Sequence, residues 1–193
     1  MAESQDDEAL FWVDPDYRGV FELDKFHISR SLTRRIRQEP YQIRTNTAFL
    51  AVVSGCASRP KTWINAPLLN LYEKLHQMGY AHSIEVWDDD VLVGGVYGLA
   101  IGGAFFGESM FSRRKDASKI ALAYLVDRLR LGGFMLFDTQ FITPHLASLG
   151  AVEISRDDYR SRLKLALPVR ADFLRELDTV DAHSVLQRNT HTS

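Results

Sequence analysis

The sequence contains very little cysteine and no long apolar run. Cys56 is the only cysteine among 193 residues, so the chain can form neither an internal disulfide nor a metal site built on paired cysteines. No uncharged apolar stretch approaches the roughly 18 residues that a membrane-spanning helix requires. The acidic start of the chain, residues 1–8, lacks the apolar core of a signal peptide. These absences predict a cytoplasmic protein that does not associate with membranes.

Motifs of several enzyme classes are also absent. The sequence contains no nucleophile elbow, no P-loop and no HExxH motif. Its histidines lack the regular spacing of metal ligands, so we interpret them as structural polar residues. Cys56 lies between Gly55 and Ala57 and is better interpreted as a small buried residue than as a catalytic thiol. We therefore expect a protein that needs no metal.

Positive and negative charges nearly cancel, but they are unevenly distributed. The chain has 23 Lys and Arg against 25 Asp and Glu, a formal net charge of −2. Residues 1–25 hold eight acids and two bases, whereas residues 26–61 hold seven bases and one acid. All but one of these seven bases are arginines, whose planar guanidinium group suits phosphates. This indicates a directed basic patch, although a solvated helix face would show the same pattern.

Hydrophobic periodicity and turn signals predict a fold of the α/β class. We expect helices at residues 29–37, 46–54, 62–79, 117–130, 144–149 and 156–167. We expect strands at residues 41–45, 82–87, 91–100, 104–109, 134–137 and 151–155. This order is that of an acetyltransferase-like (GNAT-type) fold, one mixed sheet flanked by helices. In the first helix, Arg30, Arg34 and Arg37 recur at i, i+4 and i+7 and present three guanidinium groups on one side.

The same pattern divides the chain into three parts. Residues 1–61 are a reduced N-terminal subdomain with the basic helix, and residues 62–167 are an acetyltransferase-like catalytic domain. Residues 168–193 are a polar C-terminal tail that we expect to fray. Two local expectations concern helix faces and ends: Met78 should lie on the core face of its helix, and Asp116 should cap the helix that follows it.

The predicted long helix is not preceded by the loop that binds coenzyme A in acetyltransferases. That loop is rich in glycine, and its backbone N–H groups hold the pyrophosphate. The corresponding residues 110–119 contain no glycine. A coenzyme A-dependent acetyltransferase is therefore only a weak alternative, and we expect no coenzyme.

Polar side chains at strand ends are the candidates for chemistry. Glu108 lies at the end of a glycine-rich strand, and Asp138 and Gln140 follow the apolar strand at 134–137. Clefts open at the ends of strands in α/β folds, which favours a site here. The alternative is that Asp138 and Gln140 only bond to loop backbone groups, and both interpretations stay open. Trp63, next to the basic segment, is a further candidate.

Several sequence blocks between about residues 10 and 165 form a specific set. The most specific are GGVYG at 94–98 and FGESMFSR at 106–113, and they are followed by Asp138 with Gln140. By these motifs the chain is similar to the bacterial leucyl/phenylalanyl-tRNA–protein transferase family. The resemblance implies an enzyme that moves leucine, phenylalanine or methionine from charged tRNA to an N-terminal Arg or Lys of a protein. That product is marked for degradation by the N-degron pathway.

The resemblance also implies roles for individual residues. Asp138 and Gln140 would form the catalytic pair: Gln140 positions the reacting groups, and Asp138 orients Gln140 or relays a proton. Glu108 would hold the α-amino group of the aminoacyl moiety, and Trp63 would contact the 3′-terminal adenosine. The acceptor-stem phosphates would be contacted by Arg30, Arg34 and Arg37. The pocket for the donor side chain would be formed by Val96, Phe105, Leu122, Leu125, Leu129 and Phe137.

The start of the chain departs from the family pattern. Chains of this family begin some tens of residues earlier, with a segment that ends in a Gly-Ile-Phe-Pro-Trp-like motif. This chain opens at Met1-Ala2-Glu3-Ser4, so we expect a truncated N-terminal subdomain. Besides an active aminoacyltransferase, a non-catalytic module that binds the tRNA end is therefore the alternative function.

Overall fold

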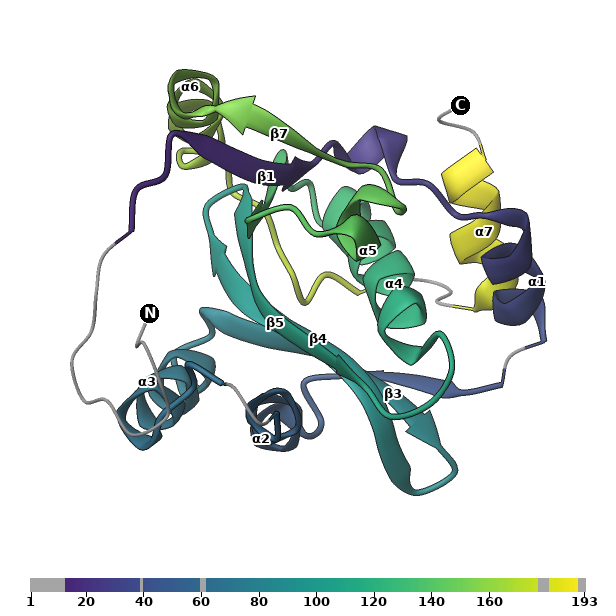
Figure 1. The fold of residues 1–193 in the computed structure, drawn as a ribbon. Helices are drawn as coiled ribbons and strands as arrows, with labels where there is room; N and C mark the ends of the chain where they lie inside the picture. The colour runs from purple at the N-terminus through teal and green to yellow at the C-terminus, as the bar shows by residue number, and fades with distance from the viewer. Residues whose placement is uncertain (1–12, 39, 60–61, 177–180, 191–193) are drawn as a thin grey trace.

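One mixed sheet organises the chain (Figure 1). The computed structural model describes residues 13–38, 40–59, 62–176 and 181–190. The strands are β1 (Tyr17–Phe21), β2 (Gln42–Thr45), β3 (Ala81–Asp88), β4 (Val91–Ile101), β5 (Ala104–Ser112), β6 (Leu136–Gln140) and β7 (Ala151–Ser155). They form a 7-stranded sheet in the order β2-β3-β4-β5-β6-β1-β7, in which β5 and β6 are parallel and the other neighbours antiparallel.

Helices cover both faces of this sheet. They are α1 (Arg30–Arg37), α2 (Phe49–Ala57), α3 (Ala66–Gln77), α4 (Ala117–Leu131), α5 (Pro144–Ala147), α6 (Arg156–Ala166) and α7 (Ala182–Thr190), with a short 3₁₀ turn, η1 (Leu23–Lys25). In Figure 1, α2 and α3 lie on one side of β3–β5, whereas α4, α1 and α7 lie on the other. The predicted α/β class, a mixed sheet flanked by helices, is confirmed.

The two largest apolar cores of the described residues lie on the two faces of the sheet. The larger lies between α4 and the sheet and includes Phe105, Leu125 and Leu129, each at most 1% exposed. The smaller lies between α2, α3 and the sheet and includes Val52 and Tyr97, both 0% exposed. In the part of the chain that the structure describes, no helix is long and apolar enough to cross a membrane.

The antiparallel hairpins and the long helix form where the sequence predicts them. The turns at Asp88–Asp90 and Gly102–Gly103 join β3, β4 and β5, and Gly102 adopts φ +57°, which glycine tolerates without strain. Helix α4 runs from Ala117 to Leu131. Thr143 caps α5 through its side chain, as expected from the Thr-Pro pair.

Two local expectations are wrong. Met78 is 67% exposed, because α3 ends at Gln77 and the chain then turns away through Gly79 at φ +79°. Asp116 does not cap α4 with its side chain: it adopts φ +62°, and the hydroxyl of Ser112 accepts a hydrogen bond from the Ser118 backbone N–H instead. A residue in this left-handed conformation does not have the extended backbone of an N-cap.

The C-terminal segment is folded, so the expectation that it frays is wrong for residues 168–176 and 181–190. Phe173 is 3% exposed and stacks on Phe105 with ring centroids 5.5 Å apart. In α7, Val185 and Leu186 belong to the larger core. Arg188 donates two hydrogen bonds to the buried Asp127 of α4, at 2.7 and 2.8 Å. The few apolar residues of this polar segment thus include several that pack into the core.

Strand β1 has no counterpart among the expected elements. It lies between β6 and β7 and pairs antiparallel with both. Its five residues carry no alternation of polar and apolar side chains: the last three, Gly19 to Phe21, are all buried. Because β1 has a neighbouring strand on each edge, its hydrogen bonds with those neighbours stabilise it more than its own residue pattern does.

Candidate active site

A cavity opens where β5 and β6 separate. The two strands pair in parallel only over Ala104–Phe106 with Leu136–Asp138, and beyond these residues they diverge. The cavity between them has a volume of about 220 Å³, which suits a small apolar group. It is lined by Arg59, Trp63, Val96, Gly107, Glu108, Ser109, Met110, Leu122, Phe137, Thr139 and Leu146.

Glu108 reaches this cavity because it is the extra residue of a β-bulge. Tyr97 of β4 faces Ser109, but the next residue, Gly98, faces Gly107, so Glu108 has no partner of its own in the ladder. A bulge bends its strand and redirects the extra side chain. The pair next to the bulge, Gly98 on β4 and Gly107 on β5, must be glycine. A Cβ on Gly98 would overlap the carbonyl of Phe106, and a Cβ on Gly107 would lie 2.9 Å from the ring of Phe137.

A second bulge shapes the end of β6. Val20 of β1 faces Asp138, whereas Gly19 faces Gln140, so Thr139 is the extra residue. Gln140 adopts φ +64°, a left-handed conformation that costs a residue with a side chain about 1–2 kcal/mol. Its backbone N–H donates a hydrogen bond of 2.7 Å to Oδ1 of Asp138. The extra residues of the two bulges, Glu108 and Thr139, both line the cavity, and Gln140 follows Thr139 directly.

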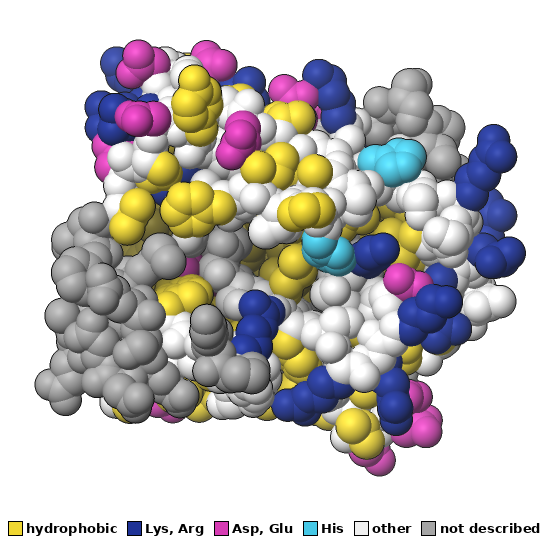
Figure 2. Space-filling view, viewed as in Figure 1, with side chains coloured by type: hydrophobic (Ala, Val, Ile, Leu, Met, Phe, Trp, Pro, Cys, Tyr) yellow, Lys and Arg dark blue, Asp and Glu magenta, His cyan; other side chains and the backbone are white. Residues whose placement is uncertain are grey.

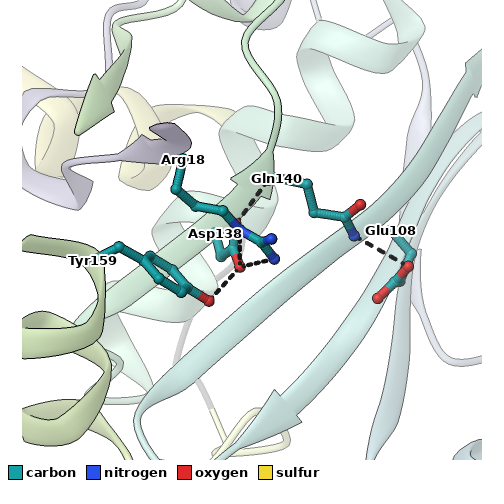
Figure 3. Close-up of polar contacts among 5 residues, drawn as sticks. All are labelled: Arg18, Glu108, Asp138, Gln140 and Tyr159. Carbon is teal, nitrogen blue, oxygen red and sulfur yellow. Dashed lines mark hydrogen bonds and ion pairs between the residues drawn. The ribbon is translucent and has the colours of Figure 1, made fainter. Parts of the chain in front are cut away.

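Glu108 and Gln140, predicted as site residues, lie within hydrogen-bond distance (Figure 3). Nε2 of Gln140 donates to Oε2 of Glu108 at 3.3 Å, and the hydroxyl of Tyr72 donates to the same oxygen at 2.8 Å. Burial raises the pKa of Glu108 above its ordinary value, because desolvation outweighs these two hydrogen bonds. The same burial, with the nearby charge of Glu108, raises the pKa of Tyr72, so its hydroxyl stays a donor.

Asp138 is fully buried and saturated with hydrogen bonds. Its Oδ1 accepts from the Gln140 backbone and from Nε of Arg18 at 3.0 Å, and its Oδ2 accepts from Nη2 of Arg18 at 2.8 Å and from the hydroxyl of Tyr159 at 2.7 Å. Burial, the largest cause, would lower the pKa of Arg18, but the hydrogen bonds and charge of Asp138, together with Tyr159 and Glu108, raise it above its ordinary value. Burial, followed by the hydrogen bond to Asp138, raises the pKa of Tyr159. Figure 3 shows these groups converging on the carboxylate.

Sequence reasoning did not identify Arg18 or Tyr159. Arg18 lies on the unexpected strand β1, and Tyr159 lies in α6, 120 and 21 residues away from Asp138 in sequence. Neither residue belongs to a motif, and no spacing connects them with Asp138. Arg59, which lines the cavity and donates a hydrogen bond to the Met110 carbonyl, was counted only as part of the basic segment.

The six residues expected in the apolar pocket lie in one core cluster, but only some of them face the cavity. Val96, Leu122 and Phe137 line it. The other three, Phe105, Leu125 and Leu129, are at most 1% exposed and are absent from its wall. Met110 and Leu146 contribute apolar surface that the sequence did not indicate. Trp63 also lines the cavity, from the segment between α2 and α3.

The three predicted arginines lie on the outer face of α1, away from this cavity. Arg30, Arg34 and Arg37 are exposed, whereas Leu32 and Ile36 on the opposite face are buried. Ser29 caps the helix by accepting a hydrogen bond from the Leu32 backbone N–H. In Figure 2, hydrophobic side chains gather in a hollow near the centre, and Lys and Arg side chains extend from below it to the right edge, over α1.

A metal centre finds no support in the described ranges. Nowhere in them do three or more His, Cys, Asp or Glu side chains come close enough together to hold a metal ion. The polar side chains of the cavity wall include Glu108, Ser109 and Thr139. Gln140 hydrogen-bonds to Glu108 from outside that wall, and Asp138 with its partners Arg18 and Tyr159 is also absent from it. Such a set can position an amine and stabilise charge on a reacting carbonyl group.

The family model and the curated relatives agree on one family. A family model described as leucyl/phenylalanyl-tRNA protein transferase matches residues 20–164. Over 193 residues, the chain is 60% identical to the leucyl/phenylalanyl-tRNA--protein transferase of Cereibacter sphaeroides (strain KD131) and covers 90% of that protein. It is 61% identical to the protein of the same name from Ruegeria sp. (strain TM1040), of which it covers 91%. Among solved structures, L-PGS from Bacillus licheniformis aligns with a TM-score of 0.44 at 18% identity, over 69% of this chain and 52% of that one.

Proposed function

Because this chain belongs to the leucyl/phenylalanyl-tRNA protein transferase family, we propose that it transfers leucine, phenylalanine or methionine from charged tRNA to the N-terminal Arg or Lys of acceptor proteins. The protein is an aminoacyltransferase, as its family membership establishes. The proposal further includes a cytoplasmic location and the degradation of the products through the N-degron pathway. The observation that carries it is the cavity that joins Glu108 and Trp63 to an apolar wall beside Gln140.

The reaction is the aminolysis of an ester. The acceptor's α-amine attacks the ester carbonyl carbon, a C–N bond forms, and the C–O bond to the ribose of the terminal adenosine breaks. The amine loses one proton, and the departing ribose oxygen gains one. Because the ester is already activated, the enzyme needs chiefly to hold the two reactants together and stabilise charge on the carbonyl oxygen.

Glu108 and Gln140 are proposed to contact the reacting groups. The carboxylate of Glu108 binds the α-amino group of the aminoacyl moiety, since a partly buried anion favours a cationic or hydrogen-bond-donating partner. The amide oxygen of Gln140 accepts no hydrogen bond from the described residues, so it can accept one from the attacking amine. Asp138, whose oxygens are already occupied, orients Gln140 through its backbone N–H.

The remaining residues are proposed to bind the rest of the charged tRNA. Trp63 contacts the terminal adenosine, because an aromatic ring at the cavity wall offers a stacking surface for a base. The exposed arginines of α1, Arg30, Arg34 and Arg37, bind acceptor-stem phosphates. The apolar wall accepts the donor side chain and excludes charged ones, since burying an unpaired charge there is costly.

The direct test is transfer of radiolabelled leucine from charged tRNA to a peptide that begins with Arg. We expect labelled peptide from the unmodified chain, no label on a matched peptide that begins with Ala, and a large loss of kcat in Gln140→Ala with tRNA binding nearly intact. Tight binding of charged tRNA without any transfer would instead favour the alternative of a non-catalytic module that binds the tRNA end.

A further inference from the structure

We propose that Arg18 and Tyr159 are positioning residues for the transfer reaction: they anchor the Asp138 carboxylate so that it fixes the backbone of Gln140 and aims the Gln140 amide at Glu108. This inference rests on the proposed function, because it names the residues that maintain the geometry of the same site. Neither residue lines the cavity; both act through Asp138. Their side chains come from β1 and α6, the elements that flank β6 on its outer side.

The acceptor positions of the Asp138 carboxylate are all occupied. A carboxylate offers about four acceptor positions, and in this protein they are taken by two Arg18 nitrogens, the Tyr159 hydroxyl and the Gln140 backbone N–H. Arg18 donates from two nitrogens of its guanidinium group, one to each oxygen, so it fixes the plane of the carboxylate and also balances its negative charge. A carboxylate so filled has no lone pair directed at the cavity, so it serves as an anchor and not as a base.

The backbone of Gln140 is held in shape by Asp138. At φ +64° this residue is strained, and a strained residue persists only where its surroundings hold it. The hydrogen bond of 2.7 Å from its N–H to Oδ1 of Asp138 is such a restraint. It is effective only if Asp138 itself cannot rotate, and rotation is prevented by Arg18 and Tyr159 on the other positions of the carboxylate.

The backbone conformation of Gln140 sets the direction of its side chain. From the left-handed backbone it extends away from Asp138 toward Glu108, and its Nε2 lies 3.3 Å from Oε2 of Glu108 (Figure 3). If Gln140 relaxed to an ordinary extended backbone, the side chain would leave this direction, because successive side chains of a strand point to opposite faces. Loosening Asp138 therefore displaces the amide from Glu108, which lines the cavity.

Two conservative variants test the role. Tyr159→Phe removes one hydrogen bond and keeps the ring, and Arg18→Lys keeps the charge but removes the fork. We expect each to lower kcat about 10- to 100-fold, the effect of losing a hydrogen bond to a charged group, with KM for charged tRNA and for the acceptor within about twofold. Hydrogen exchange at the Gln140 backbone amide should accelerate in both variants.

The chain offers a matched control in Arg188→Lys. Arg188 forms the same kind of forked pair with a buried aspartate, Asp127, which is 3% exposed, but it lies on α7 and has no part in the site. We expect Arg188→Lys to lower the melting temperature about as much as Arg18→Lys does, while it leaves kcat and the exchange rate of the Gln140 amide unchanged. Arg18→Lys or Tyr159→Phe with wild-type kcat, or with a loss confined to KM, would overturn the positioning role while wild-type transfer upholds the proposed function. Absence of transfer by the unmodified chain would overturn both.

Discussion

Glu108 lines the cavity in a buried environment that disfavours its ionised form. Its pKa is raised above the ordinary 4.5 by burial, so the folded state binds its proton more tightly than the unfolded state does. The stabilising contribution of this proton is therefore fully present below the unfolded pKa and is lost as the pH rises through the folded pKa. Above the folded pKa the ionised group opposes folding, which is a stability cost typical of functional sites.

A neutral isostere should remove that cost. Glu108→Gln is expected to raise the free energy of unfolding at about pH 8, and the gain should shrink as the pH falls toward about 3, where Glu108 is protonated in both states. Transfer activity should fall in the same variant. The measurement is urea denaturation of both proteins across this pH range, and a gain that grows toward low pH would contradict the assignment.

Leu122 and Leu125 are neighbours on α4 that differ in their access to the cavity. Leu122 lines it, whereas Leu125 is 1% exposed and lies outside its wall. Leu122→Phe should narrow the cavity and lower kcat/KM for phenylalanine more than for leucine, by about 10-fold or more, the effect expected of a side-chain size change. Steady-state transfer assays with the two charged tRNAs give this ratio.

Leu125→Phe is the matched control for that prediction. Added volume in a filled core strains the fold by about 1–3 kcal/mol, so its melting temperature should fall while the ratio between the two donors stays the same. If Leu125→Phe changed the donor ratio and Leu122→Phe did not, the donor side chain would bind deeper in the core than the cavity indicates.

At the scale of elements, one face of α1 packs on the core and the opposite face carries the exposed arginines. Leu32 and Ile36 hold the helix on the core, and Arg30, Arg34 and Arg37 are exposed on the other side. Changing the three arginines to alanine should weaken tRNA binding and flatten its salt dependence, by about one unit of the log–log slope for each phosphate that is no longer neutralised. Binding titrations at several salt concentrations measure both quantities.

Helix α6 supplies a control with the same change in charge. Arg156, Arg160 and Arg162 pair with acidic residues near the start of β1 and beyond its end, on the opposite side of the molecule from α1 in Figure 1. Alanine at these three positions should leave the salt slope unchanged. Equal effects of the two triple variants would mean that total charge, and not α1, governs binding.

At the scale of the whole molecule, the C-terminal segment completes the larger core. Leu186 is 6% exposed on α7, whereas His183 on the same helix is exposed. Leu186→Ala should lower the free energy of unfolding by about 2–5 kcal/mol, as for other buried leucines, and His183→Ala should change it by less than about 0.5 kcal/mol. Chemical denaturation measures both, and a negligible effect at Leu186 would show that α7 detaches in solution.

Local patterns were sufficient for the elements in which one stretch of chain carries its own signal. The strands β3 to β5 follow turn signals at Asp88–Asp90 and Gly102–Gly103, and α4 follows an apolar periodicity. The family, too, could be identified from short motifs, and the comparisons confirm it. Glu108 and Gln140 could be proposed as candidates because the residue pattern predicted both at strand ends. Gln140 does end β6, but Glu108 lies at a bulge inside β5, which continues to Ser112, and the structure brings the two side chains within 3.3 Å.

Other features depend on segments that are distant in the chain. Nothing in the residue pattern around Tyr17–Phe21 indicates a strand between β6 and β7, and nothing around Arg18 indicates a contact with Asp138, 120 residues away. Local patterns indicated neither the left-handed Gln140 nor the separate places of Leu122 and Leu125. The sequence by itself thus determined the elements, the family and the candidate chemistry, because side-chain periodicity and motifs are local properties. Only the tertiary structure decided the pairing of β1, the partners of Asp138 and the cavity wall, because these depend on which remote segments the common core brings into contact.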